Sequence, residues 1–392
     1  MHLRVLAIGM ALAALGSMQA AEPAEPADHP PQLLLNAQRL RRLKRDRDRL
    51  TVRWVDFENR VKTVRDSPER GFELALYYAV TGEALRKQEA LEWAKAHPCE
   101  RRQVALIRDW CGGPAPEQTC STQPPAGSIG IRDQVFSRLA AGEDLAPLVE
   151  MTKKSLVSSL LEGKFQDPDE LYAACEYLLA VRAAQQIDLR EEAPQFFSQL
   201  PIEILLALQP AKLEHPDWMT HIAALALVAL DPNLPSSQYL QGWAMEERQM
   251  VREGPGVAYE LLWADPYLPG VGYQNMDTWV YDPTPRLFAR TNWEPNSCHI
   301  EISAGGVQQE NCPAGWQDKP ATFGHLTLIP MTAPCIELPH LANNETAILW
   351  KLKPEQKLYF WSRKKRQEST ADSIGLWRAS VDVEGKVCLA NR

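Results

Sequence analysis

The chain changes its hydrophobic pattern once, across an aromatic-rich stretch at residues 254–293, and this change limits the fold more than any other feature. Upstream, apolar residues recur at helical spacing; downstream, short runs of β-branched and aromatic residues alternate with turn residues. Eight aromatic side chains fall within 35 residues: Tyr259, Trp263, Tyr267, Tyr273, Trp279, Tyr281, Phe288 and Trp293. Because binding sites favour domain boundaries, this crossover is the predicted place of a cleft.

The upstream part predicts roughly ten helices joined by short loops, packed as antiparallel hairpins. One long amphipathic helix is expected over residues 33–62. The next is expected to begin at Ser67-Pro68-Glu69-Arg70 and to stop near Gly82. Successive hairpins either stack into a solenoid or close into an α/α toroid. No internal repeat of 33–47 residues is found, which disfavours the solenoid.

The downstream part, from Thr278 onward, predicts about eight short strands in a small antiparallel sandwich or sheet. The expected fold class is α+β: an all-α, α/α toroid-like domain followed by a small antiparallel β-sandwich-like domain. The expected divisions are a signal peptide (1–21), a flexible spacer (22–31), the toroid-like domain (32–265), the aromatic crossover (266–285) and the β-domain (286–392).

The first residues resemble a secretory signal. Arg4 precedes an apolar run at residues 5–16, and small residues for cleavage follow up to Ala21. No later segment has about 18 consecutive apolar residues, so no membrane span is expected after cleavage, although an uncleaved anchor remains the alternative. We expect a secreted or periplasmic protein. The net charge of -8 argues against a general nucleic-acid partner.

The eight cysteines fit an exported chain. No CxxC pair is present, so neither a zinc ribbon nor a thioredoxin-type site is expected. Spacing suggests at least two disulfides, from the candidates Cys111–Cys120, Cys298–Cys312 and Cys335–Cys388, with Cys175 as a buried thiol. No GxSxG, HExxH, P-loop or dinucleotide-binding motif is found, and no metal or cofactor is expected.

Three segments carry a family resemblance. They are residues 72–82 (FELALYYAVTG), residues 214–221 (EHPDWMTH) before an Ala/Leu-rich helix, and the transition from WVYD at 279–282 to LFARTNW at 287–293. Together they resemble the heparinase II/III and alginate lyase group of polysaccharide lyases. The resemblance implies an incomplete α/α toroid, a β-domain, and β-elimination on an acidic, uronate-containing polysaccharide.

Elimination needs a neutralised carboxylate, a base for the C5 proton and an acid for the leaving oxygen. The catalytic candidates are His215, Tyr259, Tyr267 and Tyr273. The substrate-binding candidates are His221, Trp263, Trp279 and Arg290. Each has a structural alternative, such as core packing for Tyr259, Trp263 and His221 or a surface ion pair for Arg290.

Two functions therefore stay open: a polysaccharide lyase, and a non-catalytic carbohydrate- or protein-binding relative that keeps the scaffold. The short β-region without an HxHxD-like segment favours the second. If the crossover lines a glycan cleft, Tyr267, Tyr273 and Trp279 are expected to be partly exposed and to face a concavity shared with His215.

Overall fold

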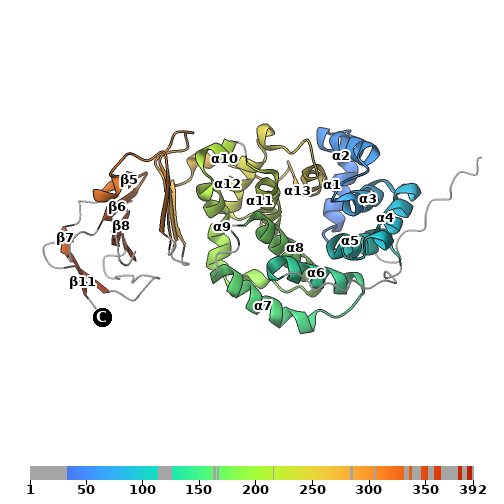
Figure 1. Cartoon of the computed structure of the whole chain (residues 1–392), viewed down its shortest axis with the longest axis horizontal. Helices are drawn as coiled ribbons and strands as arrows, with labels where there is room; N and C mark the ends of the chain where they lie inside the picture. The colour runs from blue at the N-terminus through green and yellow to red at the C-terminus, as the bar shows by residue number, and fades with distance from the viewer. Residues whose placement is uncertain are drawn as a thin grey trace, which may run out of the picture.

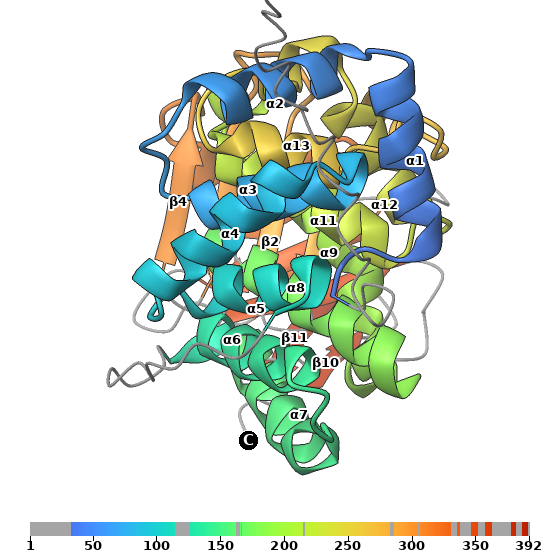
Figure 2. The same cartoon turned by 90° about the vertical axis from the view of Figure 1, so that its right-hand side faces the viewer.

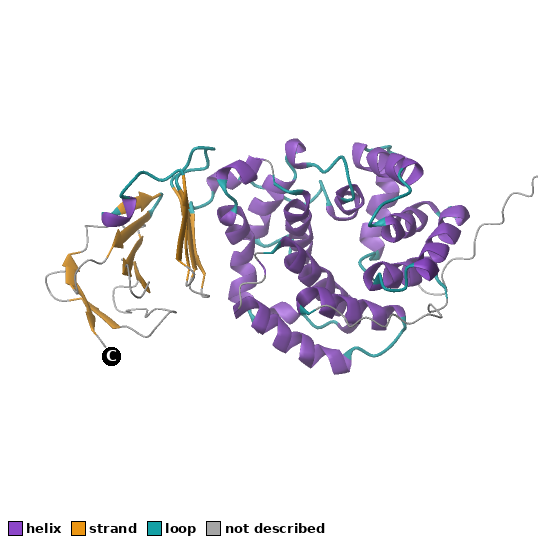
Figure 3. Cartoon of the chain, in the orientation of Figure 1, coloured by secondary structure: helices purple, strands orange, loops and turns teal. Residues whose placement is uncertain are grey.

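The structure is a computed structural model. It describes residues 33–113, 126–161, 165, 167–214, 216–282, 286–303, 306–330, 335–337, 346–351, 357–362, 378–381 and 386–390, with side chains as far as Leu328. Helices fill the N-terminal part and strands the C-terminal part (Figure 3), which confirms the α+β class. The signal peptide and spacer predicted from the sequence lie outside the described residues.

Thirteen α-helices precede the first strand in the described part of the chain. They are α1 (Ala37–Asp48), α2 (Val52–Thr63), α3 (Arg70–Thr81), α4 (Ala84–Ala96), α5 (Arg101–Cys111), α6 (Gly127–Ala140), α7 (Ala146–Leu161), α8 (Pro168–Gln185), α9 (Pro194–Ala207), α10 (Pro210–Glu214), α11 (Trp218–Leu230), α12 (Pro235–Ala244) and α13 (Gly256–Trp263). None of these described helices has the length and apolarity needed to cross a bilayer.

Six of the helices close into a ring. In order around it, α3 packs on α5, α5 on α6, α6 on α8, α8 on α11, and α11 on α13. The ring closes where α13 meets α3, with the Phe72 and Tyr259 ring centroids 4.8 Å apart. Figure 1 shows this ring beside the sheets, and Figure 2 views the helices with the strands behind them. The arrangement agrees with predicted helical hairpins that close rather than stack.

The helix predicted over residues 33–62 is wrong in one respect, because the chain breaks between α1 and α2. Leu50 adopts a left-handed backbone with φ of 51° and stays exposed. Thr51 then caps α2, its side chain accepting a hydrogen bond from the Trp54 amide. The threonine cap signals a new helix start. The predicted end of α3 is confirmed, since Gly82 occupies its left-handed C-cap with φ of 75°.

In the described part of the chain, the strands form three sheets. The first contains β1 (Trp279–Asp282), β2 (Arg286–Arg290), β3 (His299–Ser303) and β4 (Gly306–Glu310). The second has the order β5 (Ala321–Phe323), β6 (Leu326–Pro330), β8 (Thr346–Lys351) and β9 (Lys357–Ser362). The third has the order β10 (Arg378–Val381), β11 (Lys386–Ala390) and β7 (Cys335–Glu337). All pairs are antiparallel except β6 with β8, so the second sheet is mixed rather than wholly antiparallel as predicted.

The first sheet separates two apolar cores. One of its faces supplies Leu287, Ala289, Ile300 and Ile302 to a small core completed by residues of the second sheet. Its other face meets the helices, where Val280 and Phe288 join the large helical core. The sheet therefore stands between the helical ring and the remaining strands (Figure 1).

The cysteine predictions have a mixed outcome. Cys298 and Cys312 form the predicted disulfide. Cys111 is a free, buried thiol, so its predicted pairing with Cys120 is wrong; Cys99 is disulfide-bonded instead. Cys175 is free and buried, as predicted. The backbone register places Cys388 opposite Cys335, which suits the third predicted pair.

Candidate functional site

A cavity of about 450 Å³ lies between the helices and the first sheet. This volume is typical of small-molecule sites. The cavity lies at the α/β boundary, but Phe288 is the only aromatic of the predicted crossover with a described side chain that lines it. Its helical wall comes from the start of α8, from α9 and α10, and from the start of α11. Its opposite wall comes from β2, β3 and β4.

The sheet wall is polar because side chains alternate across a strand. Arg286 and Phe288 of β2, His299 and Glu301 of β3, and Gln308 and Glu310 of β4 line the cavity. The register pairs Phe288 with Glu301 and Glu301 with Gln308, and it pairs His299 with Glu310. These side chains thus form cross-strand rows on one face, while the intervening apolar residues enter the small core.

The helical wall adds aromatic rings and further charges. Phe165, Phe196 and Leu200 give it an apolar floor, and Glu203 faces the cavity from α9. Polar groups also come from Gln209, Lys212, Asp217 and Thr220. The Asp217 carboxylate is held in place as the N-cap of α11, where it accepts hydrogen bonds from the Thr220 amide at 2.9 Å and the Thr220 hydroxyl at 2.7 Å.

Arg286 acts on two carboxyl groups of the cavity, Glu203 and Glu301, which have different surroundings. Arg286 Nη2 lies 4.0 Å from Glu203 Oε2, so Glu203 is ion-paired. Burial raises the pKa of Glu301, against the opposing charge of Arg286. Glu203 is thus paired with a cation, whereas burial favours retention of the proton on Glu301 to higher pH.

His299 is neutral at physiological pH. Burial lowers its pKa to about 4, and the Arg290 charge acts in the same direction. Its Nε2 lies 2.6 Å from the Leu206 carbonyl oxygen. Because a carbonyl only accepts, Nε2 carries the proton and Nδ1 is the acceptor.

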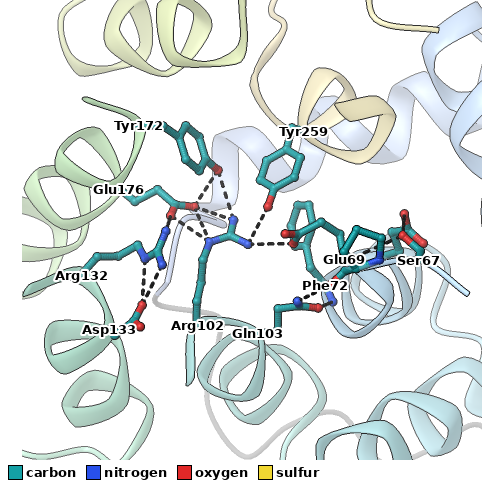
Figure 4. Close-up of polar contacts among 12 residues, drawn as sticks. Ser67, Glu69, Phe72, Arg102, Gln103, Arg132, Asp133, Tyr172, Glu176 and Tyr259 are labelled. Carbon is teal, nitrogen blue, oxygen red and sulfur yellow. Dashed lines mark hydrogen bonds and ion pairs between the residues drawn. The ribbon is translucent and has the colours of Figure 1, made fainter. Parts of the chain in front are cut away.

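The predicted candidates Tyr259 and Trp263 are buried elsewhere, inside the helical ring. Figure 4 shows Tyr259 there beside Arg102. There Arg102 of α5 binds Glu176 of α8, with Nη2 2.6 Å from Oε1 and Nε 2.9 Å from Oε2. Arg102 Nη1 donates to the Tyr259 hydroxyl at 3.0 Å. Trp263 Nε1 donates to the Tyr172 hydroxyl at 3.0 Å. Both candidates are therefore held in an internal polar network.

Arg102, Glu176, Tyr172 and Tyr259 form the Arg102 cluster, in which the polar groups bond to one another. The Tyr172 hydroxyl donates to Glu176 at 2.6 Å, and Arg132 of α6 approaches Glu176 at 3.4 Å. Burial alone would lower the pKa of Arg102, but Glu176 raises it well above its usual value. Burial raises the pKa of Tyr259 well above its usual value as well. A phenol with a raised pKa stays protonated, so no phenolate forms there to act as a base, and its fixed position suits a structural role.

His221 lies inside the α11–α13 contact. Its Nε2 is 2.8 Å from Glu260, whose other oxygen accepts from Arg53 Nε at 2.6 Å. Burial alone would raise the pKa of Glu260, but the hydrogen bond from His221 and the Arg53 charge hold it below its usual value. This geometry favours the structural alternative for His221, in which the side chain packs in the core.

Tyr273 and Arg290 share a third location, beside Trp293. Tyr273 is 3 % exposed and meets the Trp293 ring edge-on at 5.2 Å. Arg290 is fully buried, lies over the same ring at 4.7 Å, and donates from Nη2 to the Leu208 carbonyl at 2.8 Å. The expectation that Tyr273 is partly exposed is wrong, because its ring fills the join between α12 and the first sheet. The predicted surface ion pair of Arg290 is also wrong.

The remaining candidates are separated. Tyr267 is 58 % exposed and lies beneath the Arg45 guanidinium, with its hydroxyl accepting from Arg49 at 3.2 Å. Trp279 is half-buried and packs against the small β-core. His215 lies outside the described residues. Of the seven candidates that the structure describes, none lines the cavity.

The cavity residues were missed by sequence reasoning, although they carry a signal. In HIEIS, polar residues occupy every second position of a strand next to a domain boundary. Such alternation predicts a strand with one polar face. The sequence could not show that this face turns toward the helices, because that depends on the second sheet covering the apolar face.

Among the described residues, no group of three or more His, Cys, Asp or Glu side chains is arranged to hold a metal ion. No protein-family model and no curated protein gives a significant match to this chain.

Proposed function

We propose that the protein is an exported carbohydrate-binding protein and that the cavity between the helices and the first sheet is its binding site. The carrying observation is the composition of the two walls: amide and carboxyl groups of the sheet face the phenyl rings of Phe165 and Phe196 on the helical side, and Phe288 adds a ring on the sheet itself. Sugar hydroxyls pair with the former, and the apolar faces of pyranose rings pack on the latter.

The charge of the lining favours a neutral glycan over a uronate. Two cationic side chains line the cavity, those of Lys212 and Arg286. They are outnumbered by the four carboxyl groups of Glu203, Asp217, Glu301 and Glu310. An anionic sugar would meet like charges there, which opposes binding. Lys212 is exposed, so its charge is largely screened by solvent.

The lyase reading is the weaker one. Elimination at Tyr259 would need a uronate at the centre of the ring, where Arg102 and Glu176 already lie. The resemblance to polysaccharide lyases still supports a glycan ligand, as does the succession of helical ring and sheets. Export is supported by the signal-like first residues and by the Cys298–Cys312 disulfide.

Titration calorimetry against a panel of neutral and uronate oligosaccharides tests this function. We expect binding by at least one neutral member and weaker binding of uronates. Gln308→Ala, which alters an exposed cavity-lining amide, should weaken binding by about 3- to 10-fold, the value of roughly one hydrogen bond. Gln195→Ala, at an exposed position of α9 outside the cavity, is the matched control. Equal effects of the two variants would contradict the assignment.

A further inference from the structure

Two carboxyl groups stand on opposite walls of the same cavity. Glu203 belongs to α9 on the helical wall, and Glu301 belongs to β3 on the sheet wall. Hydrolysis of a glycosidic bond needs such a pair: one carboxylic acid protonates the leaving oxygen, and one carboxylate assists attack at the anomeric carbon.

The surroundings assign different roles to the two groups. Glu203 is 4 % exposed and ion-paired with Arg286, with Arg286 Nη2 4.0 Å from Glu203 Oε2. Glu301 lies in register between Phe288 and Gln308, so an aromatic ring and an amide flank it. Burial raises the pKa of Glu301, as a general acid requires.

We propose that this cavity hydrolyses a glycosidic bond, with Glu301 as the general acid and Glu203 as the general base. The proposal rests on carbohydrate binding in the cavity. Glu301 gives its proton to the glycosidic oxygen while the bond from that oxygen to the anomeric carbon breaks. A water molecule adds to the anomeric carbon and gives its proton to Glu203. One water is consumed, two sugar hydroxyls are formed, and solvent exchange resets both carboxyl groups.

Direct attack by water on the anomeric carbon gives inversion of its configuration. Other charged and titratable side chains around the cavity also shape the pH profile. They are Arg286 of β2, His299 of β3, Glu310 of β4, Lys212 of α10 and Asp217 at the start of α11. Activity is expected to fall as pH rises through the raised pKa of Glu301, because the acid is then deprotonated.

The test uses the full mature chain with the oligosaccharides that bind it and with a panel of aryl glycosides. Release of reducing ends or of the aryl group measures hydrolysis, and calorimetry on the same samples measures binding. Glu301→Gln should lower turnover by at least about 100-fold while changing affinity only a few-fold. Glu203→Gln should have the same effect. Glu203 is buried beside Arg286; if Glu203→Gln protein fails to fold, the result with Glu301→Gln decides between the outcomes.

Glu247→Gln is the matched control, since Glu247 is exposed and does not line the cavity. It should leave turnover unchanged. Binding without hydrolysis would overturn the hydrolytic proposal alone and leave the binding function standing. Absence of both binding and hydrolysis would overturn the two together. Hydrolysis that survives Glu301→Gln would contradict the assignment of the acid.

Discussion

The molecule contains two polar clusters built from similar residues, and they differ in closure. The Arg102 cluster at the centre of the helical ring joins arginine, glutamate and tyrosine from several helices through hydrogen bonds of 2.6 to 3.3 Å. The cavity wall presents arginine, glutamate, histidine and glutamine from one sheet face across an open space. In the first cluster the partners are within the protein; in the second, space remains for a ligand.

This difference separates structural from functional use of charged residues. A buried arginine with its carboxylate in place fixes the helices around it, and removing one partner leaves an unpaired charge. A polar face on a cavity costs less to maintain because water can solvate it. Residue type alone does not distinguish a structural from a functional cluster. Tyr259 and Trp263 were therefore predicted as site residues from the sequence.

The largest expected effect is in the closed cluster. Arg102→Met leaves Glu176 buried without its main partner and should lower the free energy of unfolding by about 4 kcal/mol. Urea denaturation followed by circular dichroism measures it. Arg252→Met breaks an ion pair whose arginine is 55 % exposed, and should cost less than about 1 kcal/mol. Similar losses in both variants would remove the distinction between the clusters.

The disulfide beside the cavity wall gives the next effect. Cys298 precedes β3 and Cys312 follows β4, so their bond fastens two strands of the polar face. Replacing both by alanine should lower the free energy of unfolding by about 3 kcal/mol. Because the lost disulfide joins two strands of the cavity wall, oligosaccharide affinity should fall as well. Arg102→Met protein that remains folded should bind oligosaccharide with unchanged affinity. A loss of stability without any change in affinity would place the site elsewhere.

The pH dependence of stability probes the wall itself. The pKa of His299 is lowered to about 4 by burial, so the unfolded chain takes up a proton that the folded chain refuses between pH 6.5 and 4. Stability from this residue is present above pH 6.5 and is lost as pH falls toward 4, by up to roughly 3 kcal/mol. His299→Gln, which keeps a donor for the Leu206 carbonyl, should flatten that slope in denaturation curves measured across the range. An unchanged slope would mean that His299 is already solvated.

The smallest effect concerns the exposed crossover. Tyr267→Ala removes a surface ring that contacts Arg45 and Arg49, which should cost roughly 0.5 to 1 kcal/mol of stability. Oligosaccharide affinity and turnover should not change. A tenfold loss of either would return the site to the crossover predicted from the sequence.

The sequence allows prediction of the parts that depend on local pattern. Helical periodicity, the Gly82 cap and the switch to strands at Thr278 are readable because each follows from spacing and turn chemistry. The break at Leu50 was missed because its neighbours keep helical spacing. A cleft was expected at the α/β boundary, but its lining residues were not identified. The burial of Tyr273 and the exposure of Glu301 to the cavity depend on packing between distant segments, which the sequence does not show.

Hydrogen–deuterium exchange with and without a saturating neutral oligosaccharide tests the central claim most directly. If the cavity is the binding site, protection should appear at His299, Glu301 and Gln308 in β3 and β4 and around Glu203 in α9. Helices α5 and α6, which hold Arg102 and Arg132 and do not line the cavity, should be unchanged. Protection confined to residues 265–275, or no protection at all under conditions of binding, would contradict the account.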